Sequence, residues 1–281
     1  MRSLHNVLAP AKLNLFLHIT GQRNDGYHLL QSVFMLIDWC DTLHFDLRND
    51  GLVERQDIST PLPANDLVLR AAHALQQASG TPLGANIAIE KNIPAQAGMG
   101  GGSSDAATTL LALNRLWSLN WSRAKLMPLA LSLGADVPFF VDGHNAWVEG
   151  IGEQITPIDL PSRRFVVVKP DAGLETAKIF RQPQLQRATE TATMSVFVVD
   201  PFGFGRNDLQ PVAQVLCPEI TEALEWLGSL GLSPRMTGSG SAVFAQLPDG
   251  VSIDSAPHNW QMRICSNMAV HPQASWAVSE S

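Results

Sequence analysis

Alternating apolar and polar positions near the start of the chain predict a β-strand and its partner. Residues 12–19 alternate with a period of two, which is typical of a strand. One face carries Leu13, Leu15, Leu17 and Ile19, and the other carries Lys12, Asn14, Phe16 and His18. A turn signal at 24–26 and an apolar run at 29–39 predict an antiparallel partner, and residues 42–47 predict a further strand.

Three segments in the middle of the chain have the periodicity and end signals of helices. A helix is predicted over 68–77, because Asp66 and the residue before it form a capping signal. A second helix is predicted over 104–119, where it follows a glycine-rich segment and carries one apolar stripe. A third helix is predicted between a cap at Ser122 and a stop at Gly134.

The second half of the chain mixes strands and helices. Strands are predicted at 145–150, 155–160, 165–169 and on both sides of a turn within 235–247, with a helix at 219–230 and a long loop at 183–195. Prolines and polar residues near 157–164 predict a boundary between a domain at 1–160 and a domain at 161–281. The pattern weakens beyond Pro248, although Trp260 and Trp276 indicate that the tail packs.

Composition narrows the class of protein. The 281 residues are 45% hydrophobic and 16% charged, which is enough to bury a sizeable core. The formal net charge of −7 gives no broad attraction for nucleic acid or an anionic membrane. The three cysteines are widely spaced, and no apolar run has the length of a membrane span. We therefore expect a cytoplasmic protein, a monomer or a weak homodimer, that has no nucleic-acid or membrane partner.

A glycine-rich segment is the strongest chemical signal. It consists of Pro94, Ala95, Gln96, Ala97, Gly98, Met99, Gly100, Gly101, Gly102, Ser103 and Ser104. Glycine adopts positive φ and lets bare backbone approach a ligand closely. The helix that follows offers free N–H groups and the positive end of its dipole, and two serine hydroxyls can bond phosphate oxygen or a magnesium ion. This order of elements predicts a phosphate site.

Other interpretations of the segment are weaker. It is not a Walker A loop, because no lysine follows the glycines before Ser103. The glycine spacing also differs from a dinucleotide-binding fingerprint, and no early βαβ unit surrounds it. The remaining alternative is a flexible turn with an ordinary serine cap. The succession of strand, glycines, serines and helix favours phosphate.

Lys12 and Asp136 are candidate catalytic residues. Lys12 lies near the start of the first strand, on the face that also carries Asn14. Asp136 lies between a helix end and an apolar run. Taken alone, Lys12 could be a solvated lysine, and Asp136 could cap a short helix that Pro138 begins. Together with a phosphate loop they form a kinase constellation, with a base for the attacking hydroxyl and a cation for phosphoryl charge.

Three segments resemble one superfamily. They are PAKLNL at 10–15, the glycine-rich segment continued by DAA at 105–107, and TGSGSA at 237–242. They are similar to the three motifs of the GHMP kinases. The resemblance implies an α+β fold of two lobes, an N-terminal lobe like the second domain of ribosomal protein S5 and a C-terminal ferredoxin-like lobe, with ATP and substrate between them.

A narrower match lies within that superfamily. GQRNDGYH at 21–28 and LGADVPFF at 133–140 resemble kinases of the non-mevalonate isoprenoid pathway. Those kinases phosphorylate the 2-hydroxyl of a cytidine diphosphate sugar alcohol. The resemblance implies that Asp136 is the base, that Lys12 assists it, and that residues 98–104 hold the triphosphate of ATP. It also implies Mg²⁺ on the phosphates, bound by Ser103 or Ser104.

Further residues are assigned by the same resemblance. Asn14 is expected to touch the substrate, as are Gly238 and Ser239 in the third motif. Asn65 and Lys91 are expected near the nucleoside of ATP.

Three aromatic side chains predict a cytosine pocket. Tyr27, the only tyrosine, directly follows a turn, so its ring could stack on a base, and His28 could hydrogen-bond the polar edge of that base. Phe180 is the expected second wall of the stack. The alternatives are a hairpin aromatic that covers the core, a solvated histidine and a core phenylalanine. The family resemblance favours the pocket.

Two features depart from the family pattern. Residues 95–97 are less glycine-rich than in relatives, which leaves 98–104 intact. No acidic magnesium ligand on another helix is identified, and Asp105 is expected to support the helix N-terminus instead.

Two rival functions stay open at this stage. One is a GHMP kinase for another alcohol, such as homoserine or mevalonate, which the turn before Tyr27 disfavours. The other is a non-catalytic binding protein on the same fold, which the presence of both Lys12 and Asp136 disfavours.

Overall fold

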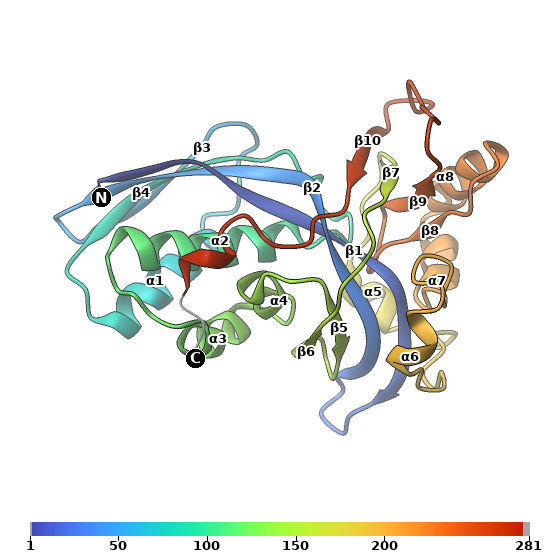
Figure 1. The fold of residues 1–281 in the computed structure, drawn as a ribbon, viewed down its shortest axis with the longest axis horizontal. Helices are drawn as coiled ribbons and strands as arrows, with labels where there is room; N and C mark the ends of the chain where they lie inside the picture. Colours follow the sequence, from blue (N-terminus) through green and yellow to red (C-terminus); the bar gives the residue numbers. More distant parts are fainter. Residues whose placement is uncertain (1, 278–281) are drawn as a thin grey trace.

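A long antiparallel pair of strands forms the centre of the molecule (Figure 1). In this computed structural model, which describes residues 2–277, the pair consists of β1 (Ser3–Gln22) and β2 (His28–Arg48). The predicted pairing is confirmed. The prediction of a separate strand at 42–47 is wrong, because β2 continues through these residues without a break.

The first sheet contains six strands in the described chain. Besides β1 and β2 they are β3 (Val53–Asp57), β4 (Gly84–Glu90), β5 (Ala146–Glu149) and β6 (Gln154–Pro157). The order is β3-β4-β2-β5-β6, with β1 paired to β2, and only β3 and β4 run parallel. Four helices lie along one face of this sheet (Figure 1): α1 (Leu67–Ser79), α2 (Gly101–Leu116), α3 (Arg123–Leu133) and α4 (Val137–Asp142). Their apolar faces fill the first core.

Helix ends follow the signals in the sequence. Asp66 caps α1 by accepting a hydrogen bond from the backbone N–H of Leu69 at 3.1 Å, and Gly80 ends the helix in the left-handed conformation. Ser122 caps α3 in the same way, as predicted. The predicted start of α2 at Ser104 is wrong, because the helix already begins at Gly101. Two of the loop's glycines therefore belong to the first turn of α2.

Within residues 2–277 the second sheet contains four antiparallel strands in the order β10-β7-β9-β8. They are β7 (Arg164–Lys169), β8 (Arg235–Met236), β9 (Val243–Leu247) and β10 (Gln261–Ser266). Four helices accompany it: α5 (Thr176–Phe180), α6 (Met194–Phe197), α7 (Gln210–Leu216) and α8 (Pro218–Ser229). The predicted loop over 183–195 ends where α6 begins. The α+β class with two lobes is confirmed.

Strand β7 joins the two lobes because both of its faces are buried. Phe165 and Val167 pack with Leu13 and Leu15 of β1, while Val166 and its neighbours on the other face pack with α7 and α8. The alternation along one strand thus connects the second core to the long hairpin. The cleft described below is therefore bounded by lobes that share a hydrophobic core.

Strand β1 departs from the predicted alternation at one point. Its pairing with β2 shifts register between Asn14 and Leu17, where a bulge interrupts the ladder. Phe16, predicted on the polar face, consequently packs in the same core as Leu15. Leu17 falls in the adjoining core beneath the second sheet.

The chain changes sheets between β6 and β7, close to the predicted domain boundary at 160/161, which stays a prediction. The predicted packing of the tail is confirmed. The short 3-10 helix η1 (Ala274–Trp276) returns to the first lobe, where Trp276 packs against the first core. Met268 donates its backbone N–H to Leu36 of β2.

Candidate active site

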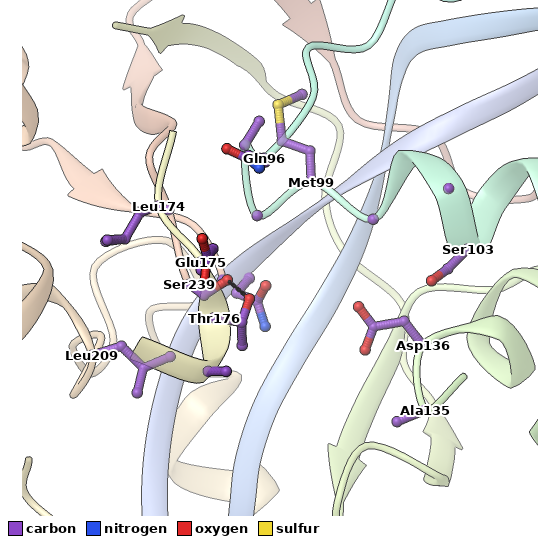
Figure 2. A pocket seen from close by; sticks show the side chains of 18 of the residues that line it. Gln96, Met99, Ser103, Ala135, Asp136, Leu174, Glu175, Thr176, Leu209 and Ser239 are labelled. Carbon is purple, nitrogen blue, oxygen red and sulfur yellow. Dashed lines mark hydrogen bonds between the residues drawn. The ribbon is translucent and has the colours of Figure 1, made fainter. Parts of the chain in front are cut away.

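A cleft of about 1670 Å³ lies where the two lobes meet. Its lining comes from β1, the turn between β1 and β2, the loop before α2, the start of α4, α5 and the turn at 238–240. Figure 2 shows Asp136 on one side of this cleft and Thr176 with Ser239 on the other. Most of the residues predicted for the site are therefore brought into one cavity.

The glycine-rich loop is fixed to the turn that precedes β9. Gln96 accepts a hydrogen bond from the backbone N–H of Ser241 at 3.0 Å, and Ala97 accepts one from Ala242 at 3.2 Å. Gly98 has φ +72°, and a Cβ there would lie 2.3 Å from the carbonyl oxygen of Thr237. Only glycine fits so close an approach of two backbones. The second and third sequence motifs thus form one structural unit.

The first turn of α2 faces the cleft without a side-chain cap. Its N-cap is Gly100, at φ +71°, and no side chain within residues 2–277 makes a capping hydrogen bond there. The N–H groups of a first helical turn have no partner within the helix. Together with the helix dipole they form a site for an anion.

The two predicted metal-binding serines differ in position. Ser103 lines the cleft (Figure 2). Ser104 is fully buried, lies outside the cleft lining, and its hydroxyl has no hydrogen-bond partner among the described residues. Metal binding by either serine stays a prediction, and of the two only Ser103 lines the cleft.

A buried ion cluster holds both ends of the glycine-rich loop. Lys91 donates to Asp41 and, at 2.5 Å, to Asp105 of α2. Asp41 also accepts the backbone N–H groups of Asn92 at 2.5 Å and Ile93 at 2.7 Å. The expectation that Asp105 supports the helix N-terminus is wrong, since its carboxylate binds Lys91. One cluster thereby fixes the chain before the loop and the helix after it.

The charges of this cluster are not balanced, because two carboxylates share one ammonium. Burial raises the pKa of Asp105 to about 8, against the opposing effect of the Lys91 ammonium. Burial also disfavours the charge on Lys91, but Asp105 and Asp41 outweigh it and raise the pKa of Lys91. A charged Lys91 therefore lies beside an Asp105 that readily holds a proton.

Lys12 and Asp136 lie together in the cleft. The Lys12 Nζ is 3.8 Å from Asp136 Oδ2, it bonds Asn14 Oδ1, and it lies 4.6 Å from the centre of the Phe34 ring. Lys12 is almost fully buried, and this burial lowers its pKa against the opposing charge of Asp136. Asp136 precedes α4 without capping it by its side chain. The alternative of a solvated Lys12 is wrong, whereas Asp136 does occupy the N-cap position of α4, although its side chain makes no capping hydrogen bond.

Asn14 is buried beside this pair. Its backbone N–H bonds the Thr237 hydroxyl at 2.9 Å, and its Nδ2 donates to Ser32 at 2.8 Å. Its Oδ1 accepts from Lys12. Asn14 therefore orients the lysine and ties β1 to the 237–242 turn.

The predicted aromatic residues occupy the far end of the cleft. The rings of His28 and Phe180 are stacked, with centroids 4.8 Å apart and planes 29° apart. Tyr27 lines the cleft with 59% of its surface exposed. Arg187 donates to the His28 ring at 3.1 Å. Sequence reasoning missed Arg187 because it lies in the polar loop before α6 and carries no motif.

Of the remaining predicted residues, three line the cleft and one does not. Lys91, Gly238 and Ser239 line the cleft, and the Ser239 hydroxyl hydrogen-bonds Thr176 at 2.6 Å (Figure 2). Asn65 is exposed and lies outside the cleft lining, whereas its neighbour Asp66 lines it. Asp41 was also missed, because an aspartate within an apolar strand gives no signal of the loop that it anchors.

Family models match both lobes. The description GHMP kinases N terminal domain matches residues 66–144, and GHMP kinases C terminal matches 202–261. The crystal structure of a homoserine kinase from Cytophaga hutchinsonii has the same fold, with a TM-score of 0.69 at 15% identity over 96% of each chain. Fold and cleft together define an ATP-dependent kinase of the GHMP class.

Closer relatives specify the family. A 4-diphosphocytidyl-2-C-methyl-D-erythritol kinase from Albidiferax ferrireducens is 67% identical over 280 residues, covering 100% of this chain and 98% of the relative. One from Paracidovorax citrulli is 62% identical and covers 100% of both chains. A crystal structure of 4-(cytidine 5'-diphospho)-2C-methyl-D-erythritol kinase matches with a TM-score of 0.73 and 35% identity, over 85% of this chain and 88% of that one. This chain belongs to the family of 4-diphosphocytidyl-2-C-methyl-D-erythritol kinases.

The helices give no sign of a membrane span. None of those within residues 2–277 combines the length and the apolar character that crossing a bilayer requires.

Proposed function

We propose that this chain transfers the γ-phosphoryl group of ATP to the 2-hydroxyl of 4-diphosphocytidyl-2-C-methyl-D-erythritol. The reaction belongs to the non-mevalonate isoprenoid pathway and takes place in the cytoplasm. One observation carries the proposal: a single cleft contains an anion-binding helix N-terminus, the Lys12–Asp136 pair and the aromatic pair of His28 and Phe180. These parts match the phosphates, the reacting hydroxyl and the pyrimidine base of the two substrates.

The phosphates of ATP bind at the loop and the first turn of α2. Backbone N–H groups from Gly101 onward supply the donors, and the dipole of a helix of 16 residues adds a positive potential. The carbonyl of Met99 accepts the backbone N–H of Lys12 at 3.0 Å, which places the loop beside the lysine. The γ-phosphoryl group is thereby directed toward Lys12 and Asp136.

Asp136 accepts the proton of the 2-hydroxyl as that oxygen attacks. The oxygen forms a bond to the γ-phosphorus, the bond from that phosphorus to the bridging oxygen breaks, and ADP leaves with the bonding electrons. Lys12, as an ammonium, stabilises the charge on the attacking oxygen and on the transferred group. A positioned base contributes about 10²- to 10⁴-fold to the rate, and fixed charges in a water-poor cleft add to it.

Magnesium chemistry fits the donor set beside the loop. No group of three or more histidine, cysteine or acidic side chains within residues 2–277 is arranged to hold a metal. Mg²⁺ at nucleotide sites is usually bound through phosphates with only one or two protein oxygens. Ser103 supplies one such oxygen on the cleft wall. Bound there, the cation would neutralise phosphate charge.

The cytidine end of the acceptor binds near the aromatic pair. Tyr27 and Phe180 offer ring faces for stacking, and His28 offers a ring nitrogen to the polar edge of the base. The cleft is large enough for both substrates, since small-molecule sites span about 300–1,000 Å³.

A coupled assay of ADP release tests the proposal. The purified chain is supplied with ATP, Mg²⁺ and either the complete cytidine substrate or 2-C-methyl-D-erythritol 4-phosphate, which lacks the cytidine moiety. We expect turnover of the first and at least about a 100-fold lower kcat/KM for the second, because base binding is lost. Equal turnover of the two would contradict the substrate assignment. Turnover of homoserine or mevalonate at the same rate would do so as well.

A further inference from the structure

Arg187 connects the two aromatic residues of the base-binding end. Its Nε donates to His28 Nε2 at 3.1 Å, while its Nη2 donates to the carbonyl of Phe180 at 3.0 Å and to that of Gln182 at 2.8 Å. Its Nη1 donates to the carbonyl of Leu185 at 3.1 Å. The guanidinium therefore donates to three backbone carbonyls and to the histidine ring at the same time.

The bond from Arg187 determines which nitrogen of His28 carries a proton. A guanidinium has five donors and no acceptor, so the ring nitrogen that faces it must offer a lone pair. Burial, together with the charge of Arg187, lowers the pKa of His28, which keeps the ring neutral near pH 7. A neutral ring with a bare Nε2 carries its proton on Nδ1.

The other ring nitrogen is available to a ligand. His28 lines the cleft, and no group within residues 2–277 hydrogen-bonds its Nδ1. Nδ1 is therefore a donor without an intramolecular acceptor. A free imidazole favours the opposite tautomer, with the proton on Nε2, so Arg187 reverses the ring's own preference.

We propose that Arg187 is a positioning residue that makes His28 select cytosine over uracil. The proposal rests on the proposed function, because it names how that substrate's base is chosen. At its N3 position cytosine has a lone pair, whereas uracil has an N–H group. A histidine with an Nδ1–H donor can hydrogen-bond the N3 lone pair of cytosine, whereas it would face the N–H donor of uracil. The opposite tautomer would present a lone pair to the base and match uracil.

The hydrogen bond from Arg187 to the Phe180 carbonyl links the tautomer of His28 to the geometry of the ring stack. Because the same guanidinium holds the Phe180 carbonyl, the donor on His28 and the ring face of Phe180 keep one relative orientation. A lysine in place of Arg187 could still donate to Nε2 but could not reach all these carbonyls at once. Tautomer control and stack geometry are thus separable by substitution.

The experiment compares Arg187→Met, Arg187→Lys and a control, Arg163→Met, in the full-length chain. Arg163 is exposed and lies outside the cleft lining, and among the described residues its side chain bonds only the carbonyl of Ser162. Nitrogen-15 NMR of the histidine rings reports the tautomer. Steady-state kinetics with the cytidine substrate and its uridine counterpart report the selectivity.

In the native chain and in Arg163→Met we expect the Nδ1–H tautomer. In Arg187→Met we expect the Nε2–H form and a ratio of kcat/KM for cytidine over uridine that is about 10-fold lower, the size of one hydrogen bond. The change should fall on the KM of the cytidine substrate, with kcat and the KM of ATP altered less than about twofold. Arg187→Lys should keep the tautomer and most of the selectivity. In a His28→Ala background, Arg187→Met should change the ratio no further.

Other outcomes overturn the proposal. An unchanged tautomer in Arg187→Met would remove its basis. A loss of kcat with an unchanged cytidine-to-uridine ratio would assign Arg187 to structure alone. If Arg187→Met does not fold, Arg187→Lys carries the test, and loss of the Nδ1–H tautomer there would contradict the account. Should the native chain phosphorylate neither nucleotide, the proposed function fails, and the tautomer measurement still decides the role of Arg187.

Discussion

The two ends of the cleft present different chemical groups to their ligands. The phosphate end consists of backbone, held by a buried ion cluster in which Asp41 is 0% exposed. The base end consists of side chains on a turn and a short helix, and Tyr27 there is 59% exposed. A phosphate group has the same shape in every nucleotide, so fixed N–H groups suffice for it. A base must be distinguished by its edge, which requires side chains with a defined donor pattern.

The two ends should also differ in how well they tolerate amino-acid substitutions. At the phosphate end, removal of the Lys91 ammonium would leave the Asp41 and Asp105 carboxylates in the interior without a cation, which costs about 3–5 kcal/mol. At the base end, the aromatic groups are partly solvated, and their loss should weaken binding while leaving the fold intact. Substitutions at the two ends should therefore separate effects on ATP from effects on the acceptor.

The largest effect is expected midway between the ends, at the reacting groups. Asp136→Asn removes the base, so kcat should fall about 10²- to 10⁴-fold. ATP affinity, measured by calorimetry, should change little because the loop remains intact. Asp142→Asn, at the far end of the same helix α4, is the matched control and should retain activity. Undiminished turnover in Asp136→Asn would contradict the assignment of the base.

A pair of glycine substitutions compares the two ends directly. Gly98→Ala places a Cβ 2.3 Å from the Thr237 carbonyl, so the loop must move and kcat/KM for ATP should fall by more than about 10-fold. Gly26→Ala, in the turn at the base end, has φ +90° and nothing within 4 Å of the added Cβ. It should cost only about 1 kcal/mol of stability. Thermal unfolding and ATP titrations measure both, and equal losses would show that the ends do not differ.

Phe180→Ala should affect only the acceptor. Loss of one stacking face costs about 1–3 kcal/mol per base, so the KM of the cytidine substrate should rise by about 10-fold. The KM of ATP is the internal control and should stay constant. A comparable rise in both KM values would mean that the two ends are coupled through the fold.

A further effect is a pH dependence of stability at the phosphate end. The pKa of Asp105 is about 8 in the folded chain, above its ordinary value of 3.8. A raised pKa contributes stability that is complete below the unfolded value and is lost as pH rises through the folded value. Because an amide does not titrate, Tm of the native chain should fall relative to Asp105→Asn between about pH 4 and about pH 8. A difference independent of pH would show that Asp105 is ionised throughout.

The sequence predicted elements whose signals are local. The caps of α1 and α3, the antiparallel hairpin and the glycine-rich loop all follow from residues near one another in the chain. The boundaries of β2 and α2 were misjudged, because a long strand and a glycine-led helix depend on their packing partners.

Contacts between residues far apart in the sequence could not be predicted in the same way. Asp41 and Asp105 are 64 positions apart, as their numbers show, and meet only through Lys91. Arg187 reaches His28 across 159 positions. No local pattern encodes such pairs, so the sequence indicated the chemistry of the cleft but omitted the residues that hold it in place. Asn65 is the converse case, a local match whose side chain lies outside the cleft lining.

Phosphorus-31 NMR of one reaction mixture tests the central claim most directly, because it shows whether an alcohol of the cytidine substrate receives the phosphoryl group. With ATP, Mg²⁺ and the cytidine substrate, we predict a new phosphomonoester signal that grows as ADP forms, while the diphosphate signals of the cytidine substrate persist in the product. The new signal should be absent with Asp136→Asn over the same time. ADP formation without that phosphomonoester, or a phosphomonoester formed equally well by Asp136→Asn, would contradict the account.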